Sequence, residues 1–135
     1  MDSPVVHHLL VSRRVSYDWS DRVTPYSLHH LVFLFRPPAG SGYPFVASEL
    51  WLFALVEGDN ECELWVELVR LAGGQPDDEL VAAYGPFVVR LGPEQGPLSR
   101  AWRLLGVPFP TPGWYEFRLL HTGELLATET IYLEA

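Results

Sequence analysis

Five histidines are the residues of this chain best suited to metal binding or proton transfer. They are His7, His8, His29, His30 and His121. Four of them form tandem pairs, and on a β-strand the members of a pair project from opposite faces, so one from each pair could meet at a shared site. Zinc needs three or four ligands in a tetrahedral arrangement, and only Asp18 and Asp21 are loose candidates for the rest. We therefore interpret these histidines as ordinary surface or half-buried residues.

Acidic residues gather at 57–61 and 77–79, where they could supply oxygen ligands for calcium. Sandwich domains that bind calcium collect such ligands from several loops at one end. Turn chemistry explains Asp59 and Asn60, a solvated loop explains the second cluster, and the spacing is not that of an EF-hand. The sequence indicates no metal and no other cofactor.

Nucleophilic chemistry has little support in the sequence. Glu61 and Glu63 flank the single cysteine, Cys62, and oppose formation of its thiolate, so we interpret Cys62 as a packing residue. The serines show no Gly-x-Ser-x-Gly elbow, no glycine-rich loop leads from a strand into a helix to cradle phosphate, and the absence of lysine excludes Schiff-base chemistry. The chain is predicted not to be an enzyme, although any two of its seventeen acids could converge.

Composition limits the remaining function classes. The 135 residues carry a net charge of -8, and every basic residue is arginine. Binding to duplex nucleic acid or to an anionic membrane needs a cationic footprint, so neither is expected. With no signal peptide, no apolar run near the roughly 20 residues that cross a bilayer and one cysteine, a cytoplasmic protein is expected.

Proline and glycine interrupt the chain at short intervals, and apolar segments of strand length lie between the interruptions. This spacing is typical of an all-β domain, and no break is long enough to be a linker, so residues 1–135 are predicted to form one domain. The expected strands are 5–16, 28–36, 46–57, 61–71, 79–91, 99–107, 114–121 and 125–133.

A hairpin across Gly58-Asp59-Asn60 is the clearest local prediction. A three-residue loop would pair alternate positions of the two arms that are wholly apolar, and these would face the core. The expected core positions, with those of a later strand, are Leu50, Leu52, Ala54, Leu64, Val66, Leu68, Tyr115, Phe117 and Leu119.

The outward face of this expected hairpin would carry three aromatic side chains among glutamates. Either another part of the chain covers them, such as the proline-rich segment 37–44, or the face is an interface with a partner. The residues of this candidate interface are Trp51, Phe53, Trp65, Glu63 and Glu67.

A Gly-x-Tyr-x-apolar pattern at Gly113, Tyr115 and Phe117 is typical of immunoglobulin-type sandwiches, in which the tyrosine hydroxyl bonds back to the preceding corner. Phe117 stands where a disulfide-bonded domain would have cysteine. The pattern favours an immunoglobulin-like antiparallel β-sandwich of seven to eight strands.

From about residue 9 to its end, the chain resembles a family of small bacterial proteins of unknown function with a predicted immunoglobulin-like sandwich. The motifs that carry the resemblance are Tyr43-Pro44-Phe45, the apolar hairpin, Val107-Pro108-Phe109 before Pro112-Gly113-Trp114-Tyr115, and Thr122-Gly123-Glu124-Leu125-Leu126. The resemblance implies a fold and no activity.

Two functions lead after these exclusions, and an enzyme with an unrecognised site is the third alternative. The first is a non-enzymatic interaction module that binds a protein partner, or a second copy of itself, through the aromatic face. The second is a module that binds a small ligand, such as a carbohydrate, by stacking it on exposed tryptophans. Trp19, Trp102 and Trp114 are candidates for such stacking, and core packing is the competing interpretation.

Overall fold

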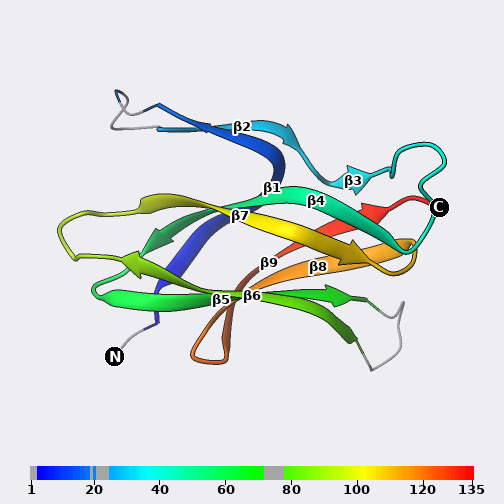
Figure 1. Ribbon diagram of the computed structural model, residues 1–135. Helices are drawn as coiled ribbons and strands as arrows, with labels where there is room; N and C mark the ends of the chain where they lie inside the picture. Colours follow the sequence, from blue (N-terminus) through cyan, green and yellow to red (C-terminus); the bar gives the residue numbers. More distant parts are fainter. Residues whose placement is uncertain (1–2, 19, 21–24, 72–77) are drawn as a thin grey trace.

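The computed structural model describes residues 3–18, 20, 25–71 and 78–135. Regular structure in these residues is entirely β and forms two sheets packed face to face (Figure 1). The strands are β1 (Val5–Tyr17), β2 (Tyr26–Leu31), β3 (Leu34–Phe35), β4 (Phe45–Glu57), β5 (Glu61–Arg70), β6 (Glu79–Arg90), β7 (Leu98–Phe109), β8 (Gly113–His121) and β9 (Glu124–Leu133).

The four-stranded sheet has the order β2-β1-β4-β7, and the five-stranded sheet has the order β3-β9-β8-β5-β6. Strand pairs are antiparallel except for the short parallel pair of β3 and β9. The fold is an immunoglobulin-like β-sandwich, so the expected class is confirmed. The described residues form nine strands rather than seven or eight, because the expected strand 28–36 divides into β2 and β3, which join different sheets. None of the described structure is a helix that could span a bilayer.

The core lies between the two sheets and consists of inward-facing side chains, which are alternate residues along each strand. All nine expected core positions are buried, with at most 1% of any of them exposed. Buried together with them are Val56 and Val107 of the four-stranded sheet and Val89 and Ile131 of the five-stranded sheet. Period-two alternation therefore predicted correctly which side chains face inward.

The pairing of β4 with β5 was predicted wrongly. The two strands do not form a hairpin: β4 pairs with β1 and β7, whereas β5 pairs with β6 and β8. The connection through Gly58 crosses from one sheet to the other, and a Cβ on Gly58 would lie 3.0 Å from the Leu91 side chain. The apolar faces of β4 and β5 belong to opposite sheets and contribute to the same core instead of lying side by side in one sheet. The alternation of apolar and polar residues in the two strands fits this arrangement as well as it fits a hairpin.

Tyr115 forms the expected corner. Its side chain is completely buried, its hydroxyl donates to the Thr111 carbonyl at 2.6 Å, and it accepts from the Thr111 N–H at 3.2 Å. The ring of Phe109 meets the Tyr115 ring edge-on at 5.0 Å. The hydroxyl therefore fixes the β7–β8 corner onto the aromatic end of the core, as the Gly-x-Tyr pattern predicted.

We expect Tyr115→Phe to lower the free energy of unfolding by about 1–2 kcal/mol, because the half-buried amide and carbonyl of Thr111 lose their partner. Urea denaturation checks this. Tyr132→Phe is the matched control, since no hydrogen bond to the Tyr132 hydroxyl occurs among the described residues, and it should change stability by less than about 0.5 kcal/mol. Equal stabilities of the Tyr115→Phe variant and the parent chain would contradict the assigned role of the hydroxyl.

The β8–β9 hairpin turns at Thr122 and Gly123, where the sequence predicted a turn. Both have positive φ angles, 48° and 80°, the conformation of a two-residue type I′ turn. Glycine adopts it freely, but the β-branched Thr122 is strained there.

Thr122→Asn should therefore raise the free energy of unfolding by about 1 kcal/mol, because asparagine tolerates the left-handed region. Thermal denaturation at constant pH measures the gain. The matched control is Thr128→Asn, an exposed position within β9 where asparagine has the lower strand propensity and no gain is expected. A Thr122→Asn variant less stable than the parent would contradict this account of the turn.

Candidate functional site

The residues of the expected interface lie on opposite sides of the sandwich. Trp51 and Phe53 belong to β4 and point outward from the four-stranded sheet, whereas Glu63, Trp65 and Glu67 belong to β5 and point outward from the five-stranded sheet. The single aromatic face expected from a β4–β5 hairpin is therefore corrected. Two separate outer surfaces remain.

The chain itself partly covers the aromatic residues of β4. The Phe53 ring meets the Tyr26 ring at 6.1 Å in an edge-on arrangement. The Trp51 indole N–H donates to the Glu49 carboxylate, which also lies 3.2 Å from Arg103. The covering of Phe53 thus comes from the start of β2, not from the segment 37–44 that the sequence analysis considered.

Trp65 lies in an apolar row that crosses the five-stranded sheet. Leu120 of β8 is directly opposite Trp65, and Leu125 of β9 is directly opposite Leu120. Val88 of β6 lies opposite Glu63. Glu63 precedes Trp65 by two residues on β5, so both project from the same face of the sheet. Trp65, Val88 and Leu125 are 43%, 50% and 51% exposed. We call Trp65, Leu120, Leu125 and Val88 the Trp65 face.

The Trp65 ring is held in place from the β6 side. A Cβ on Gly85 would lie 3.0 Å from the indole ring, so the backbone of Gly85 packs directly against it. The ring therefore rests on backbone rather than on a flexible side chain, and part of its surface stays open to solvent.

Acidic side chains flank the Trp65 face. Glu63 and Glu67 project from β5 on either side of Trp65, and within the described residues neither has an ion-pair partner. Arg118 lies opposite Glu67, but its guanidinium bonds Glu116 at 2.7 Å and Asp78 at 3.1 Å. The bond to Glu116 is the main cause that raises the pKa of Arg118. Among the described residues, no ion pair therefore neutralises the two glutamates beside Trp65.

A second aromatic pair lies at the other end of the same face. Trp114 is 52% exposed, stands opposite Tyr132, and its ring lies 4.9 Å from the Tyr132 ring. Of the other stacking candidates, Trp102 is buried and stacks on Phe87 at 5.1 Å. Trp19 lies outside the described residues.

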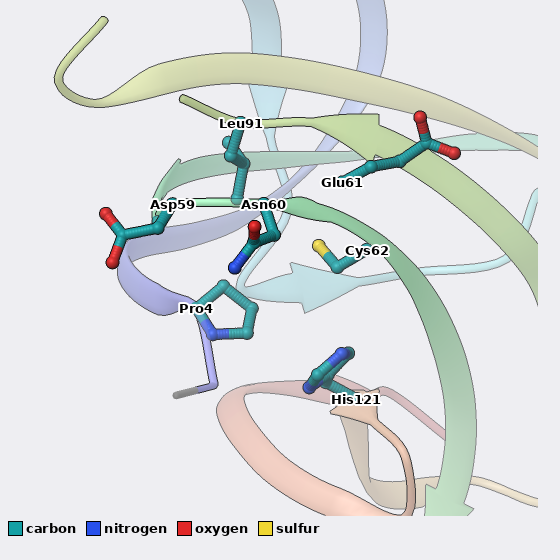
Figure 2. A pocket seen from close by; sticks show the side chains of 8 residues that line it. Pro4, Asp59, Asn60, Glu61, Cys62, Leu91 and His121 are labelled. Atoms are coloured by element: carbon teal, nitrogen blue, oxygen red, sulfur yellow. The ribbon is translucent and has the colours of Figure 1, made fainter. Parts of the chain in front are cut away.

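Cys62 lines a small pocket at the end of the sandwich, where β4 passes over into β5 (Figure 2). The pocket has a volume of about 30 Å³, which is room for about one water molecule. Burial, followed by the nearby charge of Glu61, raises the pKa of the Cys62 thiol. The carboxylates of Asp59 and Glu61 point away from the thiol and from each other (Figure 2). The arrangement matches a packing cysteine, as expected.

The candidate metal ligands are dispersed. His7 contacts Glu57 at 2.9 Å, and His29 contacts the Ser16 hydroxyl at 2.9 Å. Among the residues that the structure describes, no group of three or more histidine, cysteine, aspartate or glutamate side chains is placed to hold a metal ion. Asp21 and Asp77 lie outside those residues.

Tyr84 and Glu129, both on the five-stranded sheet, also have raised pKa values. Burial raises the pKa of Tyr84 on β6 and of Glu129 on β9. Two strands, β5 and β8, separate them in the sheet, a distance of about 14 Å. The two groups therefore do not form an acid–base pair.

Comparison with known proteins finds distant structural similarities only. No protein-family model and no curated protein matches the sequence. An immunoglobulin-like protein from Pseudomonas aeruginosa is 11% identical with a TM-score of 0.43, and the match covers 98% of both chains. An alkylpurine DNA glycosylase from Pseudomonas fluorescens, bound to DNA containing an abasic site analog, is 15% identical with a TM-score of 0.49 over 98% of this chain. A β-glucosidase from Listeria innocua, in complex with glucose, is 10% identical with a TM-score of 0.47 over 95% of this chain.

This chain spans 30% of the glycosylase and 16% of the β-glucosidase. Both matches are to enzymes several times longer than this chain.

Sequence reasoning missed the neighbours of Trp65. Alternation along β8 places Leu120 on the same face as Trp114, so its outward direction could have been predicted. Its position beside Trp65 depends on the pairing of β5 with β8, strands about fifty residues apart, for which the sequence holds no local signal.

Proposed function

We propose that this chain is a non-enzymatic interaction module that binds a protein partner through the Trp65 face. The observation that carries the proposal is the row of Trp65, Leu120 and Leu125 across three strands, in which Trp65 and Leu125 are exposed and Leu120 is half-buried. Tryptophan dominates binding energy at protein interfaces because it buries a large rigid surface. A row crossing several strands offers a continuous apolar centre of the kind such interfaces have.

Charge determines the kind of partner. Glu63 and Glu67 lie on either side of Trp65 without an ion pair in the described structure, and the chain carries a net charge of -8. A partner with an apolar centre and a basic rim would be attracted to this surface, whereas a second copy would bring like charges together. We therefore propose a different, basic protein as the partner. We further propose that the chain acts in the cytoplasm, because its single cysteine, Cys62, has no partner for an internal disulfide. From the motifs, we propose that it is related to the small bacterial proteins that it resembles.

Trp65→Glu should abolish capture of the partner from a lysate of the source cells while the far-ultraviolet circular dichroism stays unchanged. The exposed Trp114→Glu, on the same sheet face but outside the row, is the matched control and should retain capture. The captured protein, purified, should bind the parent chain directly, and raising the salt from about 0.15 to 0.5 M should weaken that binding.

Equal capture by both variants would overturn the assignment of the face. A dimer of the purified chain that Trp65→Glu dissociates, seen by analytical ultracentrifugation, would replace the basic partner with a second copy.

A second proposal is carbohydrate binding, favoured by the exposed Trp114–Tyr132 pair. Aromatic rings open to solvent on a flat sheet can stack on the apolar face of a sugar ring. A glycan that binds there should quench tryptophan fluorescence in the parent chain but not in Trp114→Ala. Absence of quenching across a glycan panel, or quenching that persists in Trp114→Ala, would contradict it.

A further inference from the structure

Half of β4 has a neighbouring strand on one side only. β7 accompanies β4 from its first residue, Phe45, whereas pairing with β1 ends at the Ser12–Trp51 pair. Beyond Ser12, β1 curves away from β4 and continues with β2 (Figure 1). A strand with one neighbour leaves the backbone N–H and C=O groups of its other edge unpaired. Residues 45–50 of β4 therefore present an open edge, to which no other described segment bonds through its backbone.

Local interactions at Ser12 accompany the point at which β1 separates from β4. Ser12 is completely buried at the branch point, and its hydroxyl lies 2.8 Å from the carbonyl oxygens of Arg14 and His29. His30 has a φ of 63°, and the register passes from the Ser12 pair to the Arg14 pair without a pair at Arg13. A buried hydroxyl thus satisfies carbonyl groups where the regular ladder is interrupted.

A cleft of about 480 Å³ lies along this open edge, and its lining combines aromatic with charged side chains. Phe35, Phe45 and Ala47 are among its lining residues, and the Phe35 and Phe45 rings are 5.6 Å apart. Phe35 also stacks on Phe109 of the core at 6.3 Å. The lining is therefore anchored to the core and offers an apolar surface to alternate side chains of an added strand.

The charge in this β4 cleft is positive and uncompensated. The Arg13 guanidinium carbon lies 4.5 Å above the Phe35 ring, and no carboxylate of the described residues is within ion-pairing distance of it. The other charged residues of the lining are already paired, Arg36 with Glu134 and Glu49 with Arg103. In a chain of net charge -8, a free guanidinium beside an open strand edge favours an anionic occupant.

We propose that the β4 cleft binds an extended acidic peptide segment of another protein. The segment adds a strand to residues 45–50 of β4 and places a carboxylate against Arg13. Six strand residues span about 20 Å, and only an extended backbone can satisfy hydrogen-bonding groups along such a length. This site is separate from the Trp65 face and does not depend on it.

The probe is a pool of acetylated and amidated hexapeptides that alternate glutamate or aspartate with valine, isoleucine, leucine or phenylalanine. We expect the pool to shift the amide resonances of residues 45–50 in ¹⁵N-labelled protein and to slow hydrogen exchange there. The same pool with N-methylated alternate amides keeps the side chains but cannot form the ladder, and it should produce no shift. A pool with lysine in place of the acids can form the ladder but lacks the contact with Arg13, so it should bind more weakly than the acidic pool.

Arg13→Gln should weaken binding of the acidic pool about fivefold, the size of an exposed charge pair. The neighbouring arginine, which does not line the cleft, gives the matched control Arg14→Gln, for which binding should be unchanged. The proposal is overturned if the acidic pool does not bind at millimolar concentration, if the N-methylated pool binds equally well, or if the shifts lie outside the cleft. Trp65→Glu should leave this binding intact, so failure of the Trp65 face and failure of the cleft are distinguishable.

Discussion

The packing of β4 against β5 across the core is the constraint on which the rest of the structure depends. Their inward side chains, from Leu50 to Val56 and from Cys62 to Leu68, are almost fully buried in the one core cluster between the two sheets. Only three residues join the two strands, and this short connection passes from one sheet to the other. Burial of apolar area is the dominant favourable term in folding, and two facing apolar strands provide it without pairing. β1 and β7 pair with β4, β6 and β8 pair with β5, and β2, β9 and β3 extend the two sheets from these strands.

The positions of the two outer surfaces follow from the passage of the chain between the sheets at residues 58–60. Because β4 and β5 face each other, their outward residues lie on opposite sides of the molecule, and Trp51 cannot share a surface with Trp65. The outer side of β4 is partly covered by the start of β2, which β1 carries over it as it bends at Ser12. The same bend opens the edge of β4. One bend thus covers Phe53 and exposes the backbone of residues 45–50, while the Trp65 face remains open.

Short-range patterns in the sequence predicted the core and the local corners, because alternation and turn chemistry are local properties. Every expected core residue, the Tyr115 corner and the turn at Thr122 agree with the structure. Strand pairing could not be predicted in the same way, since the alternation of β4 and β5 matches a hairpin and a sandwich crossing equally well. The Trp65 row and the open edge both arise from pairings between distant segments, and Arg13 acquires significance only once β1 is known to leave β4.

Nuclear Overhauser effects between α-protons of neighbouring strands test most directly whether β4 and β5 belong to different sheets. The account predicts cross-strand contacts of β4 with β7, in the register that places Phe53 opposite Ala101 and Leu52 opposite Trp102. It also predicts side-chain contacts, without α-proton contacts, between β4 and β5. Strong α-proton contacts between residues 51–55 and 63–67 would show a hairpin in one sheet, and would contradict both the separation of the outer surfaces and the open edge of β4.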